Sequence, residues 1–212
     1  MVSLGICLRA SPDHPSTVVA LDRQSTVAFI GRFSEDDELV RIVQAQRPKI
    51  IAIGAPLGLP SGLGCLEASC PCEPAVPQRK GRRSELELTR MGISCFFSYK
   101  GSIVSRLIYR SIELGRRLRS LGLNVIEAYP HATKVILFGD NVPPKNGAAS
   151  LAFLKERLSP LIDGLDDQVV GFDHHTCTAV LNAYTALLHQ RDATDVVGTP
   201  EEGMLVLPKL PR

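Results

Sequence analysis

The sequence predicts an α/β domain with three layers, in which helices cover a mixed sheet on both sides. Three observations lead to this prediction: a hairpin of short apolar strands opens the chain, strands and helices alternate after it, and residues 50–53 form a fully apolar strand. Such a strand is typical of sheets that are covered on both faces. The length of 212 residues, with 44% hydrophobic and 22% charged residues, fits one globular domain with a core and excludes a disordered chain or a coiled coil.

The first quarter of the chain predicts four strands and one helix. Apolar or β-branched runs at 2–8, 17–21 and 26–30 indicate strands, and the polar turn 22–25 joins the last two as a hairpin. Ser34 begins a helix as a hydroxyl cap, and three acids follow it at the positive end of the helix dipole. This helix ends at Pro48, and we expect residues 50–53 to form a parallel, central strand.

The remaining elements follow a long loop. Residues 55–80 are rich in Pro, Gly and Cys and are too long for an ordinary connection, so we interpret them as a functional or metal-stapled insertion in a single domain covering 1–212. Apolar periodicity then predicts helices at about 82–91, 103–121, 150–158 and 176–189, and a strand at 123–128. Residues 204–207 fit a short edge strand or a tail.

Basic residues are concentrated in one segment. Residues 79–119 hold eleven Lys and Arg against three Glu, a local charge of +8, whereas the rest of the chain carries −6. Two interpretations remain open: the wet face of an amphipathic helix, and a surface that faces a polyanion such as nucleic acid. On the second interpretation, phosphates would be bound by Lys80, Arg82, Arg83, Arg116, Arg117 and Arg119.

Neither a membrane span nor an export signal is evident. The longest uncharged stretch, 50–66, contains two prolines and four glycines, so it does not form a spanning helix. Residues 1–8 lack the basic start of a secretory signal. We therefore expect a cytoplasmic protein without a membrane partner, in which Cys7 and Cys177 are small core residues with free thiols.

The other four cysteines form a candidate metal site. Cys65, Cys70 and Cys72 lie in the long loop and Cys95 follows the next helix, and four thiolates would make a closed structural zinc site that staples the loop. The spacing C-x4-C-x-C differs from the paired C-x2-C of common zinc modules. Free thiols and regulatory disulfides therefore remain alternatives.

Several segments, taken together, resemble a known family. They are residues 4–12, 51–57, 81–86, 92–97, 127–130, 177–179 with 183–186, and 201–203, in this order along nearly the whole chain. This set is similar to the uncharacterised family of predicted nucleases with a ribonuclease H-like fold. The resemblance implies a mixed five-stranded sheet flanked by helices.

The chain departs from this family at three positions. The resemblance implies acids at Cys7, Gly54 and Thr178, where this sequence has a thiol, no side chain and a hydroxyl. Two-metal hydrolysis of a phosphodiester needs converging carboxylates, because Mg²⁺ and Mn²⁺ prefer hard oxygen ligands. We therefore expect a catalytically impaired member that acts as a nucleic-acid-interacting or regulatory domain.

The alternative is an active nuclease that uses Mg²⁺ or Mn²⁺ with residual groups, and whether the chain is an enzyme stays open at this point. Its candidates are Glu127, Asp173 and His175. Glu127 ends a predicted strand, where α/β sheets place binding groups, and the resemblance supports it. Asp173 also fits a helix cap, His175 also fits a solvated helix start, and Asn182 offers at best a neutral oxygen.

Overall fold

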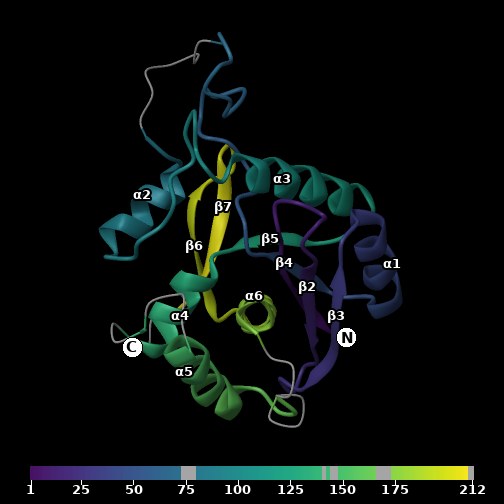
Figure 1. The fold of residues 1–212 in the computed structure, drawn as a ribbon. Helices are drawn as coiled ribbons and strands as arrows, with labels where there is room; N and C mark the ends of the chain where they lie inside the picture. The colour runs from purple at the N-terminus through teal and green to yellow at the C-terminus, as the bar shows by residue number, and fades with distance from the viewer. Residues whose placement is uncertain (73–79, 140–141, 144–147, 166–172, 210–212) are drawn as a thin grey trace.

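The computed structural model describes residues 1–72, 80–139, 142–143, 148–165 and 173–209, and the last part of the predicted loop, 73–79, lies outside them. Figure 1 shows helices on both sides of one sheet, which confirms the mixed α/β prediction. The strands are β1 (Ser3–Cys7), β2 (Ser16–Leu21), β3 (Val27–Phe33), β4 (Ile50–Ile53), β5 (Val125–Ala128), β6 (Thr194–Thr199) and β7 (Gly203–Pro208). The helices are α1 (Asp36–Gln46), α2 (Arg83–Arg90), α3 (Ser105–Ser120), α4 (Pro130–Phe138), α5 (Ala148–Leu158), a 3-10 turn η1 (Ser159–Leu161) and α6 (His174–Gln190).

The sheet has seven strands in the order β3-β2-β1-β4-β5-β7-β6, so the prediction of five strands was wrong. β1, β4, β5 and β7 pair in parallel, which confirms a parallel, central β4, while β2 and β6 pair antiparallel to their neighbours. The two additional strands form a terminal hairpin. β7 lies inside the sheet because β6 covers its outer edge, so it is neither an edge strand nor a tail.

Two hydrophobic layers cover the two faces of the sheet. On one face, Ile6 and Ile53 pack with Leu114 and Leu118 of α3 and with residues of α1. On the other face, α6 packs with Cys7 and Val19 and buries Cys177. Cys7 and Cys177 are both buried, as expected from the sequence.

α6 approaches β1 very closely. A Cβ atom placed on Gly5 would lie 2.0 Å from the backbone nitrogen of Ala183 and 2.2 Å from the carbonyl oxygen of Ala179. Only glycine in the strand and small residues in the helix allow this contact. It brings one face of α6 directly over the carboxyl ends of β1 and β4.

The main differences from the predicted helices concern α1, α6 and α4. The cap of α1 is Glu35 rather than Ser34, because the Glu35 and Glu38 side chains form a reciprocal capping box. α6 begins earlier than expected, after its cap Asp173, and α4 was not predicted. α4 begins at Pro130, whose fixed backbone angle suits the first position of a helix.

No helix in the described ranges combines the length and the hydrophobicity that crossing a membrane requires.

Candidate functional site

The positions where the resemblance implies acids meet at one edge of the sheet. The Gly54 amide donates to the Ile6 carbonyl at 3.1 Å, which aligns the ends of β1 and β4. Cys7 Sγ lies 3.6 Å from Nδ1 of His175, at the start of α6. Thr178 follows one turn later on the same helix, where its hydroxyl donates to the His174 carbonyl at 2.7 Å. The structure thus brings Cys7 and Gly54 to the helix face that carries Thr178.

Asn182 occupies the space beside Gly54. Its side chain is fully buried, and Nδ2 donates to the Ile6 carbonyl at 2.8 Å. A Cβ atom placed on Gly54 would lie only 2.3 Å from this Nδ2. A carboxylate at residue 54 therefore requires the buried Asn182 side chain to move.

Arg9 adds a positive charge to the same edge. Its Nη1 lies 2.7 Å from Nε2 of His175, and because a guanidinium only donates hydrogen bonds, Nε2 is the acceptor. The proton of the neutral ring is therefore on Nδ1, which faces the Cys7 sulfur. A guanidinium thus lies at the strand ends, where a metal-dependent nuclease would need carboxylates.

Asp173 caps α6. Its Oδ1 accepts hydrogen bonds from the Thr176 amide at 2.8 Å and from the Thr176 hydroxyl at 2.9 Å, and Oδ2 pairs with Arg32 at 2.9 Å. Burial alone raises the pKa of Asp173, but the bonds from Thr176 and the charge of Arg32 outweigh it, so the pKa lies below its usual 3.8. In the folded chain, Thr176 and Arg32 therefore occupy both carboxylate oxygens of Asp173.

Glu127 does not join this edge. It pairs in register with Ile53, and Ile53 packs on the α3 side, whereas the next residue, Gly54, faces α6. Glu127 instead forms a two-pronged ion pair with Arg82, in which Nη1 and Nη2 donate to its carboxylate at 2.8 and 2.6 Å. The residual candidates Glu127, Asp173 and His175 are therefore not brought together, because strand alternation sends Glu127 to the opposite face.

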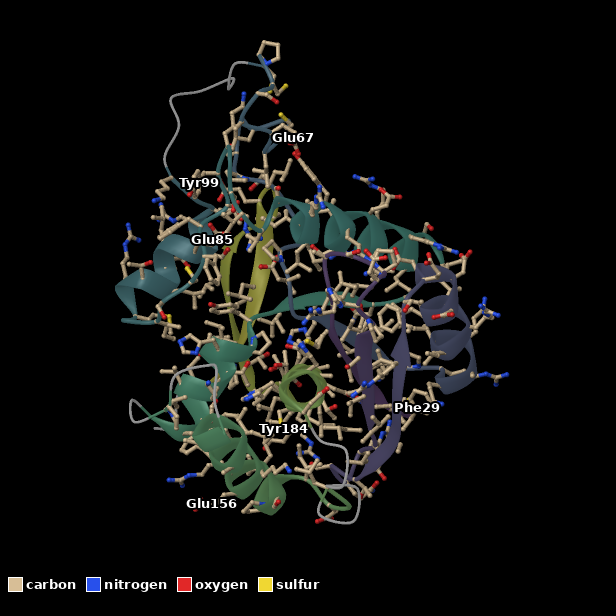
Figure 2. All side chains as sticks on the ribbon, viewed as in Figure 1. Phe29, Glu67, Glu85, Tyr99, Glu156 and Tyr184 are labelled. Carbon is tan, nitrogen blue, oxygen red and sulfur yellow. The ribbon has the colours of Figure 1, made fainter. Side chains whose placement is uncertain are left out.

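Arg82 is the centre of a larger buried network, of which Glu85 is labelled in Figure 2. Besides Glu127, its Nε donates to Glu85 at 2.9 Å. Glu85 also accepts hydrogen bonds from the amide and the hydroxyl of Ser98, at 2.8 and 2.6 Å. Desolvation lowers the pKa of Arg82, but the charges of Glu127 and Glu85 outweigh it and raise the pKa. Arg82 thus remains a cation between two carboxylates.

A small cavity of about 170 Å³ adjoins this network. Its walls include the network residues and, on the apolar side, Cys95, Phe96 and Tyr129. Burial raises the pKa of Cys95 to about 11 and also raises the pKa of Tyr129, so both groups are neutral at neutral pH. The cavity is thus a mostly apolar pocket that ends at a buried ion pair.

The predicted phosphate-binding residues lie in different environments in the structure. Arg82 is 2% exposed, so it does not reach a phosphate, and this part of the prediction was wrong. Lys80 Nζ lies 5.0 Å from the centre of the Tyr99 ring, and Arg83 pairs with Glu87 at 3.1 Å. Arg82 is buried because Glu85 and Glu127 compensate its charge. A count of charges along the sequence does not reveal this compensation.

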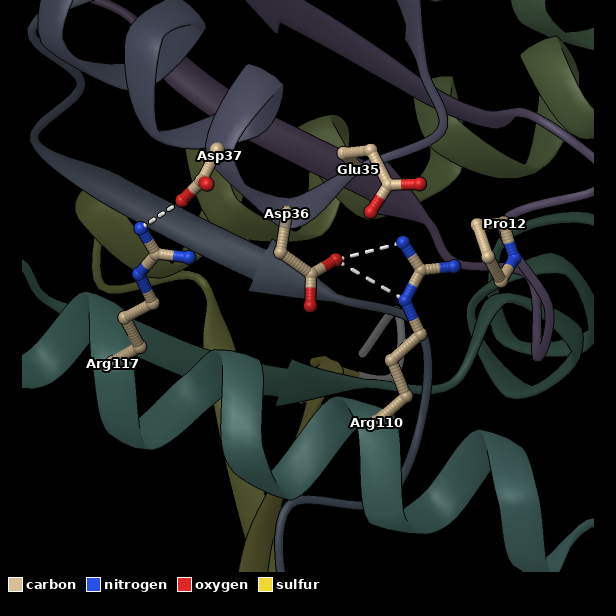
Figure 3. Close-up of a pocket in the computed structure, with 6 residues that line it drawn as sticks. All are labelled: Pro12, Glu35, Asp36, Asp37, Arg110 and Arg117. Atoms are coloured by element: carbon tan, nitrogen blue, oxygen red, sulfur yellow. Dashed lines mark hydrogen bonds and ion pairs between the residues drawn. The ribbon is translucent and has the colours of Figure 1, made fainter.

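The other three predicted residues lie on the exposed side of α3. Arg116 pairs with Glu113 and Arg117 with Asp37, while Arg119 donates to the Val125 carbonyl at 3.1 Å. Figure 3 shows Arg117 beside a hollow of about 310 Å³ between α1 and α3, which is lined by Pro12, Glu35, Asp36, Asp37, Arg110 and Arg117. The acids of α1 thus offset part of the positive charge of α3.

Three of the four cysteines predicted as ligands lie together. The Sγ atoms of Cys65, Cys70 and Cys72 lie within 4.8 Å of one another, so this group could hold a metal ion. Hydrogen bonds with Cys70, Cys65 and Lys100 lower the pKa of Cys72 to about 7. Cys95 is not part of the group, because it lies beside α2, where its thiol contacts the Glu85 carbonyl at 3.6 Å.

Sequence reasoning missed three residues of these sites: Arg9, Glu202 and Lys100. Arg9 follows the end of β1 by two residues, so strand alternation could have placed it near Cys7. Glu202 accepts hydrogen bonds from the amides of Ser61 and Arg83, which are far away in sequence. Lys100 contacts the carbonyls of Cys70 and Cys72, and no local pattern signals that contact.

Replacing Arg82 with methionine is expected to destabilise the protein by about 3–5 kcal/mol, because two buried carboxylates lose their cation. Urea denaturation at neutral pH measures the change. Arg83→Met is the matched control, with an expected change below about 1 kcal/mol, since its ion pair with Glu87 is exposed. Adding Glu127→Gln to Arg82→Met should restore part of the loss. Equal effects of the two single variants would contradict a central role of Arg82.

Replacing Asp173 with alanine is expected to cost about 1 kcal/mol at neutral pH through loss of the α6 cap. Because folding lowers the pKa of Asp173, its contribution is complete above the unfolded-state pKa and is lost as the pH falls through the folded-state value. Denaturation curves from neutral pH down to the onset of acid unfolding should therefore converge for the wild type and the variant. Asp195→Ala, at an exposed strand position, should show no such convergence.

Comparisons with known proteins leave the family open. No family model matches the chain, and no curated protein matches it. Among solved structures, the chain is similar to the Thermus thermophilus RuvC structure, with 9% sequence identity and a TM-score of 0.49, over 91% of this chain and 97% of that one. A likeness at this level carries no argument about this protein, so its function has to be argued from its own residues.

Proposed function

We propose that the chain is one ribonuclease H-like domain of the predicted-nuclease family that it resembles, and that it binds nucleic acid without cleaving it. The observation that carries this proposal is the filled space at the ends of β1 and β4. Asn182 blocks a side chain at residue 54, and the Arg9 guanidinium contacts His175 at the same edge. This proposal rests on the residues of this chain and not on the similarity to RuvC.

The sheet supports the fold that the resemblance implies. Five neighbouring strands, β3-β2-β1-β4-β5, form a mixed set with a parallel centre, and the β7-β6 hairpin extends it. The three positions where acids are implied, Cys7, Gly54 and Thr178, are carried by the two adjacent strand ends and the overlying helix. That convergence supports the assignment of the motif to these residues.

The groups at this edge do not favour hydrolysis with Mg²⁺ or Mn²⁺. They offer a thiol, an imidazole, an amide and a guanidinium, none of which is the hard anionic oxygen that these cations prefer. The alternative of an active nuclease relies on Glu127 and Asp173, but Glu127 pairs with Arg82 and Asp173 caps α6. We therefore favour binding over catalysis.

The exposed side of α3 is the best candidate surface for nucleic acid. Arg116, Arg117 and Arg119 are exposed there, and the acidic partners of Arg116 and Arg117 are themselves exposed, so a phosphate can replace these two at little cost. Aromatic residues make up only 5% of the chain, which disfavours a stacking platform for single strands. Binding through phosphates alone would not depend on base sequence.

The loss of metal binding can be tested by rebuilding the site. Purified wild-type protein should leave single- and double-stranded DNA, RNA and hybrid intact in Mg²⁺ or Mn²⁺, and its melting temperature should not change with Mn²⁺. A variant with Cys7→Asp, Gly54→Asp, Thr178→Asp and Asn182→Ala should melt at higher temperature as Mn²⁺ is added, because the ion binds only the folded state.

The same variant without Asn182→Ala should be less stable and respond less, because the amide fills the space needed by residue 54. Cleavage by the wild type that a chelator abolishes would overturn the proposal. A quadruple variant that folds but ignores Mn²⁺ would show that the acids were assigned to the wrong positions.

Nucleic-acid binding can be tested by its salt dependence. Affinity for a duplex, measured by fluorescence anisotropy, should fall steeply with salt, and each phosphate contact contributes a slope of about 0.9 on a double-logarithmic plot. The double variant Arg116→Ala and Arg119→Ala should weaken binding and lower the slope by about 2. The control pair Arg23→Ala and Lys49→Ala removes two exposed charges elsewhere and should change neither. No binding at low salt would overturn this function.

A further inference from the structure

The segment that carries three cysteines projects from the body of the molecule beyond the start of α3, in the region of Glu67 and Tyr99 (Figures 1 and 2). It is tied down near its middle, where the Leu66 carbonyl accepts a hydrogen bond from the Gly101 amide at 2.8 Å and the Leu66 amide donates to the Tyr109 hydroxyl. Its hydrophobic support is small: Leu63 and Leu66 share a separate cluster with Ile108 of α3. Beyond residue 66, thiols rather than apolar side chains gather.

The thiols have the spacing of ligands around one ion. Sγ of Cys65 lies 3.1 Å from Sγ of Cys72, the Cys72 amide donates to Sγ of Cys70 at 3.5 Å, and all three sulfurs lie within 4.8 Å of one another. Thiolates bind zinc at about 2.3 Å, so three of them around one ion lie roughly 4 Å apart. Binding of one zinc ion by these three thiolates therefore needs only small shifts of the side chains.

Lys100 supplies the matching charge. Its Nζ donates to the carbonyl of Cys70 at 2.9 Å and to the carbonyl of Cys72, so the ammonium lies against the cysteine turn. A divalent ion with three thiolates carries a net charge of −1, which one ammonium balances. The Lys100 ammonium and the soft sulfur ligands are thus both compatible with one bound zinc ion.

We propose that Cys65, Cys70 and Cys72 bind one zinc ion, which cross-links residues 65–72 within the projecting segment. Zinc completes its four ligands with water where a protein supplies three. Cys95 takes no part, since it contacts the Glu85 carbonyl beside α2. The zinc content is measured directly, so this proposal holds or fails independently of nucleic-acid binding.

Metal analysis tests the proposal directly. Protein purified without added zinc and without chelators should contain about one zinc per chain, because thiolate sites retain the ion through purification. Cys70→Ser and Cys72→Ser should lose it, whereas Cys95→Ser, the matched control, should retain it. Removing zinc with a chelator should increase protease cleavage within 55–72 and leave the resistance of the rest of the chain unchanged.

Cobalt substitution gives a readout that does not depend on the folding of variants at the three proposed ligands. Adding Co²⁺ to the metal-free wild type should produce a thiolate-to-cobalt absorption band with the intensity of three sulfur ligands, and Cys95→Ser should give the same band. A band of four-thiolate intensity that falls in Cys95→Ser would overturn the exclusion of Cys95. Zinc content near zero with all six thiols reactive, an intact-mass loss that reports a Cys65–Cys72 disulfide, or copper or iron in place of zinc would each overturn the zinc site.

Discussion

The buried ion cluster around Arg82 is the interaction that organises this structure. One guanidinium, 2% exposed, joins α2 to the end of β5 through Glu127 and contacts the Glu202 carbonyl in the turn before β7. A buried charge is tolerated only with full compensation, and here one compensating carboxylate, Glu85, is local and the other, Glu127, comes from β5. The segments that supply them are therefore fixed relative to one another.

The same cluster holds the long loop in place. Glu127 accepts a hydrogen bond from the Leu57 amide at 2.7 Å, and Glu202 accepts one from the Ser61 amide at 2.7 Å. The start of the loop is thus bound to buried carboxylates, and its middle is bound to α3 through Leu66. Within the part of the loop that the structure describes, the cysteine turn lies beyond these anchors, which is where an added metal ion would contribute most to order.

The close contact between α6 and β1 determines the chemistry at the other site. Because Gly5 lets the helix backbone approach the strand, Asn182 reaches the Ile6 carbonyl and fills the space beside Gly54. With glycine at residue 54 the buried amide has room, and a side chain at residue 54 would require the amide to move. Residues 54 and 182 are therefore sterically coupled.

The sequence by itself determined the local elements and which residues follow strand ends. Apolar runs identified β1, β2, β4 and β5, and the apolar strand 50–53 identified the parallel centre of the sheet. β6 was missed because its half-exposed sequence, TDVVGT, shows no apolar alternation, and with it the sheet size was missed.

Only the tertiary structure decided which face a residue occupies and which charge it meets. The sequence places both Glu127 and Gly54 at the ends of predicted strands. Because side chains alternate along a strand, the two residues face opposite sides of the sheet. Arg82 counts as surface charge until Glu127, from a distant segment, joins the nearby Glu85 around it, because burial of this ion depends on a long-range partner that no local pattern encodes.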